Sequence, residues 1–239
     1  MKKPIIGIPC KQPMPDNNDL WHRMEIVDEI RYLITIHGGI SIMLTPSEKT
    51  MDFNLNDLGE NKILSKEEID DLKRQVDLCD GVILQGGMYS NQFEVEIAKY
   101  AIEKDIPVLG ICAGFNNILR TLGSNVYEDD NKYHNCYSKD YRHPITIIED
   151  TLLYEIINKK EYEVNSMHTM MARRKDVEPY ATICAYDKDE NVEAFYLEDK
   201  RFVLALKWHP EIMMDEKYVD RLFERYIENV DELMKDLLK

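Results

Sequence analysis

Residues 110–114 read Gly-Ile-Cys-Ala-Gly, which places a cysteine between small residues at the end of an apolar run. The pattern glycine-x-nucleophile-x-glycine permits a sharp strand-to-helix turn that lifts a nucleophilic side chain out of a sheet. A thiol at that turn also lies at a helix N-terminus, whose partial positive charge favours the reactive thiolate. Most free cysteines are small buried hydrophobic residues. The pentapeptide alone therefore makes Cys112 a candidate nucleophile and leaves a packing role open.

Residues 207–211, which read Lys-Trp-His-Pro-Glu, supply a base and an acceptor to orient it. Pro210 favours an extended His209, and two residues of spacing in an extended segment place His209 and Glu211 on the same side. The carboxylate can then accept a hydrogen bond from one imidazole nitrogen while the other nitrogen faces Cys112. The remaining histidines lack this arrangement and are His22, His37, His134, His143 and His168.

Short apolar runs alternate with helical patterns in the first half of the chain. Strands are expected over residues 4–9, 40–46, 81–85 and 106–111, and helices over 21–37, 65–79 and 94–103. Strands too apolar to face water on one side predict a parallel sheet with helices on both faces. Cys112 then follows the fourth strand, at the carboxyl edge where open α/β sheets bind ligands.

After about residue 124, strand-like runs follow one another with few helices between them. They cover residues 144–148, 162–167, 180–187, 192–198 and 202–208, and an amphipathic helix over 215–238 ends the chain. This texture predicts an antiparallel extension of the sheet. We expect a single domain over residues 1–239, with the polar stretch 47–62 as a connecting loop.

The charge balance excludes some classes of partner. The chain has 30 basic and 45 acidic residues, a net charge of −15, and no block of lysine and arginine, so nucleic acid and anionic membranes are poor partners. No apolar stretch approaches the ~18 residues of a membrane span, and the N-terminal segment does not resemble a signal peptide. A cytoplasmic location is expected. The five cysteines are odd in number and lack a C-x-x-C pair, so free thiols and no zinc site are expected at Cys10, Cys79, Cys112, Cys136 and Cys184.

The segments GICAGFN and KWHPE together resemble the class I glutamine amidotransferase-like enzymes. VNSMH, residues 164–168, narrows the resemblance to the branch of gamma-glutamyl-gamma-aminobutyrate hydrolases, the peptidase C26-like enzymes. The resemblance implies a three-layer, flavodoxin-like α/β fold and a triad of Cys112, His209 and Glu211. It further implies cleavage of a gamma-glutamyl amide through a glutamyl thioester, which releases glutamate and an amine.

The same resemblance implies roles for the residues around the triad. The backbone N–H groups of Gly87 and Ala113 would form the oxyanion hole, and His168, Asn116 and Gly86 would contact the substrate. No metal and no organic cofactor are expected. The expected partner is a small gamma-glutamyl compound, and the oligomeric state stays open, a homodimer included.

Two alternatives remain beside the hydrolase. The same triad serves glutaminase components that deliver ammonia to a separate synthetase, and a non-catalytic or redox-sensing member would keep only the reactive thiol. The chain departs from the family pattern at Ala113, at Asn116 where glutamine is usual, and at Met88 in the segment GGMYSNQFEVE, which is shorter than in the hydrolase branch. These changes fall on the side that would recognise the amine half of the substrate.

Overall fold

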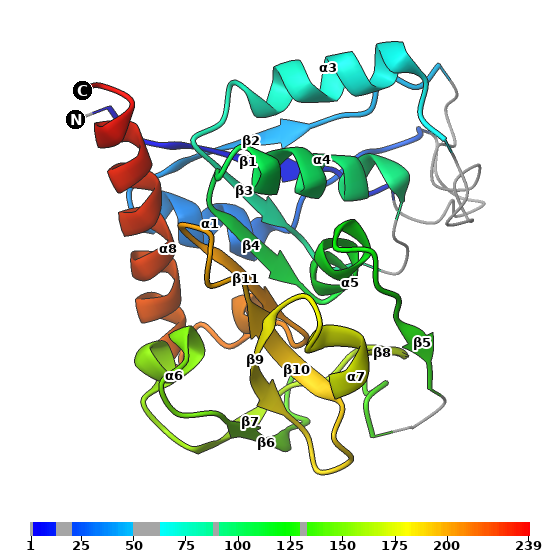
Figure 1. Cartoon of the computed structure of the whole chain (residues 1–239), viewed down its shortest axis with the longest axis vertical. Coiled ribbons are helices and arrows are strands. Elements are labelled where there is room, and N and C mark those ends of the chain that lie inside the picture. The colour runs from blue at the N-terminus through cyan, green and yellow to red at the C-terminus, as the bar shows by residue number, and fades with distance from the viewer. Residues whose placement is uncertain (1, 13–20, 50–62, 88–90, 130–132) are drawn as a thin grey trace.

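A nine-stranded sheet forms the centre of the computed structural model, which describes residues 2–12, 21–49, 63–87, 91–129 and 133–239 (Figure 1). The strand order is β2-β1-β3-β4-β11-β10-β9-β6-β7. Its strands are β1 Ile5–Pro9, β2 Ile40–Leu44, β3 Gly81–Leu84, β4 Val108–Ile111, β6 His143–Ile147, β7 Glu161–Val164, β9 Thr182–Tyr186, β10 Val192–Tyr196 and β11 Val203–Leu206. A separate two-stranded sheet pairs β5 (Tyr127–Glu128) with β8 (Met170–Met171).

The sheet changes direction at β11. Strands β2, β1, β3, β4 and β11 pair in parallel, whereas β10, β9, β6 and β7 continue the sheet with antiparallel pairs. The predicted parallel sheet with an antiparallel extension is therefore confirmed. The nine strands form one continuous sheet, which is consistent with a single domain. The single domain over residues 1–239 stays a prediction.

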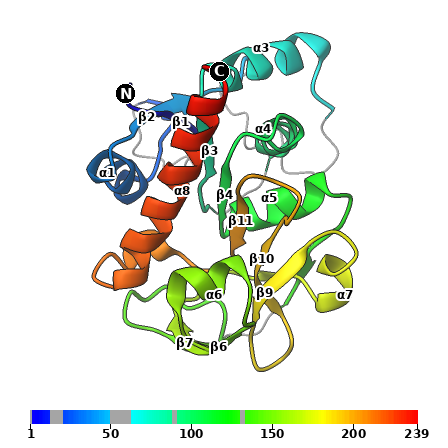
Figure 2. The ribbon, with the colours of Figure 1, turned by 60° about the vertical axis from the view of Figure 1, so that its left-hand side comes forward.

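Helices cover both faces of the sheet, so the fold has three layers. They are α1 Asp28–Ile36, α3 Lys66–Val76, α4 Gln92–Glu103, α5 Ala113–Thr121, α6 Leu152–Ile157, α7 Arg174–Val177 and α8 Lys217–Asp236. Buried residues of α1, α6 and α8 pack with Ile83 of β3 in one core, and those of α3, α4, α5 and α7 pack with its neighbours Val82 and Leu84 in the other. This alternation is the two-residue period of a strand that is buried on both faces. Figure 2 shows β3 and β4 between α1 and α8 on one side and α4 and α5 on the other.

The helix expected over residues 21–37 is shorter than predicted, because α1 begins only at Asp28. Before it, Glu25 and Lys11 exchange two backbone hydrogen bonds, and the backbone N–H of Val27 donates to the side chain of Gln85 at 2.8 Å. These long-range bonds hold the backbone extended where the apolar spacing indicated a helix. Most of the expected loop over 47–62 lies outside the described residues.

The long helix α8 carries charged side chains in each of its turns, and no described helix has the apolar length needed to cross a bilayer. Its apolar stripe instead packs on the sheet through Leu222, Phe223 and Tyr226, all buried. The helix is therefore part of the core and the last element of the fold.

The contact between α5 and β3 leaves no room for a side chain at Gly114. A Cβ atom on Gly114 would lie 2.2 Å from the backbone oxygen of Leu84. We predict that Gly114→Ala lowers the free energy of unfolding by about 3 kcal/mol or more, because the obstructing atom is backbone and a side-chain rotation cannot clear it. Urea unfolding followed by circular dichroism measures the change.

Gly123→Ala is the control for this substitution. Gly123 has a φ of +87° and nothing within 4 Å of an added Cβ, so alanine there meets only backbone strain. That strain costs about 1–2 kcal/mol. If Gly114→Ala proves no more destabilising than Gly123→Ala, the proposed close approach of α5 to β3 is wrong.

Candidate active site

Cys112 lies at the junction of β4 and α5, in a backbone conformation that side chains rarely adopt. Its φ and ψ are 52° and −99°, and its thiol is 6% exposed. Such strain costs about 1–3 kcal/mol and persists only where the surroundings enforce it. Here the backbone N–H of Cys112 donates to the carbonyl of Leu206 at 2.8 Å, and Ala113 begins α5 at once. Ala113 thus presents its N–H at a helix N-terminus, where no intrahelical acceptor takes it.

His209 connects Cys112 to Glu211. The His209 ring and the thiol of Cys112 interact closely enough to shift each other's pKa, and Nδ1 of His209 lies 2.7 Å from Oε1 of Glu211. The way in which these side chains meet differs from the sequence interpretation. Pro210–Ile212 form a 3-10 turn, not an extended segment. The turn folds Glu211 back beneath the ring, because a proline at the start of a turn fixes φ near the helical value.

The pKa values of the thiol and the imidazole are shifted in opposite directions. Burial by itself raises the pKa of the Cys112 thiol, but the charge and hydrogen bond of His209, and the charge of Lys207, outweigh burial and hold that pKa below its usual range. Burial lowers the pKa of His209, but the carboxylate of Glu211 and the thiolate raise that pKa well above the ordinary value. Both shifts favour a thiolate beside an imidazolium.

Asn165 fixes the backbone of His209, a contact that the sequence analysis did not identify. Its Oδ1 accepts from the backbone N–H of His209 at 2.9 Å, and its Nδ2 donates to the backbone carbonyl of His209 at 2.7 Å. Asn165 is fully buried just after β7. The sequence signal for Asn165 was its position in VNSMH, the segment in which His168 was selected instead.

Lys207 is a buried lysine next to the candidate site. The sequence analysis did not identify this residue either. Its Nζ donates to Oδ1 of Asn116 and lies 4.7 Å above the ring of Phe115. Burial lowers the pKa of Lys207 to about 8, while the charges of Cys112 and Glu193 oppose that shift. The sequence signal for this buried cation was a lysine within the otherwise apolar run VLALKW. Asn116, the expected substrate contact, thus has a lysine as its partner, and its role toward the substrate stays a prediction.

The glycine pair after β3 makes room for two long side chains. A Cβ on Gly86 would lie 2.4 Å from Cε1 of His209, and one on Gly87 would lie 2.9 Å from Cε of Lys11. Lys11 in turn forms a 2.6 Å ion pair with the buried carboxylate of Glu94. A side chain at position 86 would overlap the ring of His209, so glycine is required there. Gly87 is exposed beside Lys11. Their roles toward the substrate stay predictions, and residues 88–90 lie outside the described part of the chain.

His168 is buried among other polar side chains. Its Nε2 lies 3.2 Å from Oγ of Ser166, and its ring centroid is 5.2 Å from that of His134. Burial, followed by the charge of Lys207, lowers the pKa of His168 well below the usual value, so the ring is neutral. The ring faces an internal polar cluster, and a direct contact with the substrate stays a prediction.

Comparison with known proteins places this geometry in a family. Residues 62–211, well over half of the chain, match the model of the family described as Peptidase C26. The protein NtpR of Enterococcus hirae is 27% identical over 157 residues, which cover 61% of this chain and 64% of NtpR. The glutamine amidotransferase-like protein YvdE of Lactococcus lactis is 27% identical over 198 residues, which cover 70% of this chain and 82% of YvdE. The match to NtpR thus spans less than two thirds of that relative.

Solved structures share the fold at low sequence identity. The glutaminase domain of CTPS from Trypanosoma brucei, with bound acivicin, superposes with a TM-score of 0.63 at 16% identity and covers 95% of this chain and 94% of its own. A glutamine amidotransferase from Methylobacillus flagellatus gives a TM-score of 0.64 at 12% identity, with 96% of each chain covered. The strained cysteine after β4, the histidine after β11 and the family match agree, and the chain belongs to the peptidase C26 family of class I glutamine amidotransferase-like proteins.

Proposed function

We propose that this protein is a cysteine hydrolase that cleaves the gamma-glutamyl amide bond of a small compound and releases glutamate and an amine. The observation that carries the proposal is the connected series of Cys112, His209 and Glu211 at the carboxyl edge of the parallel strands. A nucleophile, a base and an acceptor that orients the base are the parts needed for acyl transfer.

In the proposed reaction the Cys112 thiolate attacks the gamma-carbonyl carbon of the substrate. The N–H groups of Ala113 and Gly87 would bind the developing oxyanion, and each such donor typically contributes ~3–4 kcal/mol. His209, already protonated, donates its proton to the departing amine, which leaves a glutamyl thioester on Cys112. A water molecule then gives a proton to the neutral imidazole and attacks the thioester, so that glutamate leaves and the thiolate is restored.

Two further residues support this reaction without touching the reacting bond. Lys207 keeps a positive charge near the thiolate, which contributes to its lowered pKa. Asn165 holds both backbone groups of His209 and so fixes the position of the ring. Both act through another residue and are positioning residues.

Release of ammonia to a separate synthetase is the second candidate function. The glutaminase domain of CTPS and the amidotransferase-like YvdE favour it, because both are similar to this chain. The match to Peptidase C26 favours hydrolysis. A non-catalytic, redox-sensing role is the third, and the complete His209–Glu211 pair weighs against it, since a sensor thiol needs no oriented general base.

The first prediction for this function concerns the substrate. The purified protein alone should hydrolyse at least one gamma-glutamyl amide of a simple alkylamine with a kcat/KM about 10-fold or more above that for glutamine, because a hydrolase pocket has room for a substituent on the amide nitrogen. Release of glutamate, measured by a coupled assay across a series of amides, tests this. Cys112→Ala should abolish turnover of each substrate.

Other outcomes point elsewhere. Turnover of glutamine alone, seen only when a synthetase is added, would establish the ammonia-delivering role. A Cys112→Ala protein with full activity would exclude the covalent mechanism. Absence of turnover with a thiol that still alkylates rapidly would indicate the redox-sensing role.

The second prediction concerns the pH dependence of thiol alkylation. Because the pKa of Cys112 is lowered, its rate of reaction with iodoacetamide should decline only as pH falls through a midpoint below the usual thiol value of ~8.5. Burial raises the pKa of Cys10, Cys79 and Cys184 to about 12, so these thiols should stay unreacted at neutral pH. The measurement uses Cys136→Ser protein and mass spectrometry, since Cys136 is partly exposed.

Glu211→Gln tests the origin of the lowered pKa. Without the carboxylate, His209 loses its proton at lower pH and its positive charge no longer stabilises the thiolate at neutral pH. The charge of His209 influences the Cys112 pKa more than that of Glu211 does. The alkylation midpoint should therefore move to higher pH. A midpoint at or above ~8.5 in the parent protein would contradict the thiolate–imidazolium pair.

The third prediction concerns Asn165. Asn165→Ala removes both hydrogen bonds to the backbone of His209 and should lower kcat about 10- to 100-fold with a smaller change in KM, because the ring loses its fixed position. Asn229→Ala is the matched control, since Asn229 also donates to a backbone carbonyl, that of Arg225, in an exposed hydrogen bond within α8. Equal kinetics in the two variants would show that Asn165 does not position the base.

A further inference from the structure

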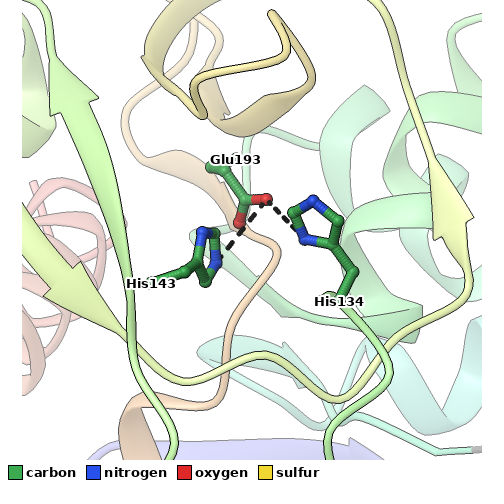
Figure 3. Close-up of side chains that lie close together, drawn as sticks. All are labelled: His134, His143 and Glu193. Atoms are coloured by element: carbon green, nitrogen blue, oxygen red, sulfur yellow. Dashed lines mark ion pairs between the residues drawn. The ribbon is translucent and has the colours of Figure 1, made fainter. Parts of the chain in front are cut away.

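A cluster of buried ligand-type side chains lies behind the active site and takes no part in the proposed reaction. It consists of His134, in the segment between β5 and β6, His143, the first residue of β6, and Glu193 in β10. Each residue offers an atom within 4.8 Å of the atoms offered by the other two. Figure 3 shows both rings turned toward the carboxylate of Glu193.

Glu193 is the unexplained member of this cluster. It is 0% exposed, and within the described residues neither of its carboxylate oxygens has a hydrogen-bond partner. A buried carboxylate costs several kcal/mol unless a counter-charge and hydrogen bonds compensate it. Nε2 of His143 is likewise buried and without a hydrogen-bond partner among the described residues. The charge of Lys207 acts on Glu193 but supplies no hydrogen bond to it, so the carboxylate and Nε2 of His143 both lack a hydrogen-bond partner within the described residues.

The distances leave space for one ion between these atoms. Oε1 of Glu193 lies 3.9 Å from Nδ1 of His134 and 4.0 Å from Nε2 of His143. Both distances are too long for direct hydrogen bonds. Metal ions of the zinc class lie ~2.0–2.2 Å from imidazole nitrogen and carboxylate oxygen, so neighbouring ligand atoms are separated by ~3.4 Å. Shortening these two distances by about half an ångström, and bringing the two imidazole nitrogens, which lie within 4.8 Å of each other, to a similar separation would seat such an ion.

Asp187 orients His134 as the partners of metal-bound histidines do. Oδ2 of Asp187 lies 3.0 Å from Nε2 of His134, and Asp187 itself accepts from the backbone N–H groups of Asp189 and Asn191 and from the side chain of Asn191. A histidine that donates from Nε2 to a carboxylate keeps its Nδ1 lone pair for a metal. Nδ1 of His134 is 3.9 Å from Oε1 of Glu193 and 3.3 Å from Oγ of Ser166. The Ser166 hydroxyl has the backbone carbonyl of His134 as a closer acceptor at 2.9 Å, which leaves the Nδ1 lone pair to an ion.

We propose that His134 Nδ1, His143 Nε2 and Glu193 Oε1 bind a divalent first-row transition-metal ion, with Zn²⁺ as the best-fitting probe. Two imidazoles and one carboxylate are a ligand set that suits zinc, cobalt and ferrous iron. The remaining position falls to water or to Nε2 of His168, which is 3.9 Å from the same oxygen of Glu193. This inference departs from the absence of metal expected from the sequence.

The site would be structural and not catalytic. It joins the segment before β6, the start of β6 and the middle of β10, three pieces of the antiparallel extension. The backbone carbonyl of Glu193 accepts from the backbone N–H of Lys207, two residues before His209. A bound ion would therefore brace the strand that carries the catalytic base without contacting the substrate.

The experiment uses untagged, full-length Cys112→Ala protein, because Cys112, His209 and Glu211 are themselves capable of binding zinc. After dialysis against a chelator, calorimetric titration with Zn²⁺ should show one equivalent bound, and Co²⁺ should give visible absorption bands of a protein-bound ion. Added Zn²⁺ should also raise the melting temperature, since an ion that binds only the folded state stabilises it.

Matched variants assign the ligands. Glu193→Gln keeps the shape of the side chain and should weaken Zn²⁺ binding about 100-fold or more, and His143→Gln, at a less deeply buried ligand, should do the same. His22→Gln, at an exposed histidine, should bind Zn²⁺ like the parent protein.

The inference is overturned if the Cys112→Ala protein without further substitutions binds no Zn²⁺ at micromolar concentration. Water would then occupy the space between the three side chains. It is also overturned if the folded His143→Gln protein binds Zn²⁺ as tightly as the His22→Gln protein. Neither outcome depends on enzymatic activity, so a failure of this proposal is distinguishable from a failure of the proposed function.

Discussion

The pairing of β4 with β11 is the constraint on which the rest of the site depends. The two strands are parallel neighbours with Ile111 opposite Leu206, and the N–H of Cys112 extends the pairing by one more bond to Leu206. Parallel neighbours end at the same edge, so the residues that follow each strand must meet there. Cys112 and His209 are almost a hundred residues apart in the chain and become partners only through this register.

The second physical feature of this edge is buried charge. Lys207 follows β11 directly and is buried opposite Glu193 of β10; burial lowers the pKa of the lysine and raises that of the glutamate. Lys11 and Glu94 form a buried ion pair beside Gly87. Buried ion pairs contribute little net stability compared with apolar residues of similar size. The position of Lys207 is better explained by function, since its charge lowers the pKa of the Cys112 thiol.

The altered position Asn116 has a physical explanation in this arrangement. Its amide oxygen accepts from Nζ of Lys207, so the shorter asparagine is matched with a long cationic partner from the neighbouring strand. Hydrolysis and ammonia release share the chemistry of the glutamyl half, and the amine side separates them. Residues 88–90, which follow Gly87, lie outside the described part of the chain.

Much of the fold and part of the site could be predicted from sequence, because those features are local. Short apolar runs specify buried strands, and α3 begins where a helix was expected, at a capping box formed by Ser65 and Glu68. The glycine–x–cysteine–x–glycine turn is local as well, since only small neighbours permit the conformation of Cys112. The prediction of a helix before Asp28 was wrong because the structure there is not decided locally. A hydrogen bond from Val27 to Gln85, which is distant in the chain, holds that backbone extended.

Tertiary structure alone decided how the triad is supported. Asn165 reaches His209 from a strand end 44 residues away, and Lys207 reaches Asn116 across 91 residues. His134, His143 and Glu193 likewise converge from separate strands and a loop. Sequence determined the chemical groups and the elements that carry them, because propensity and periodicity act over a few residues. The folded sheet decided which groups meet, because strand order and register are set by the packing of the whole core.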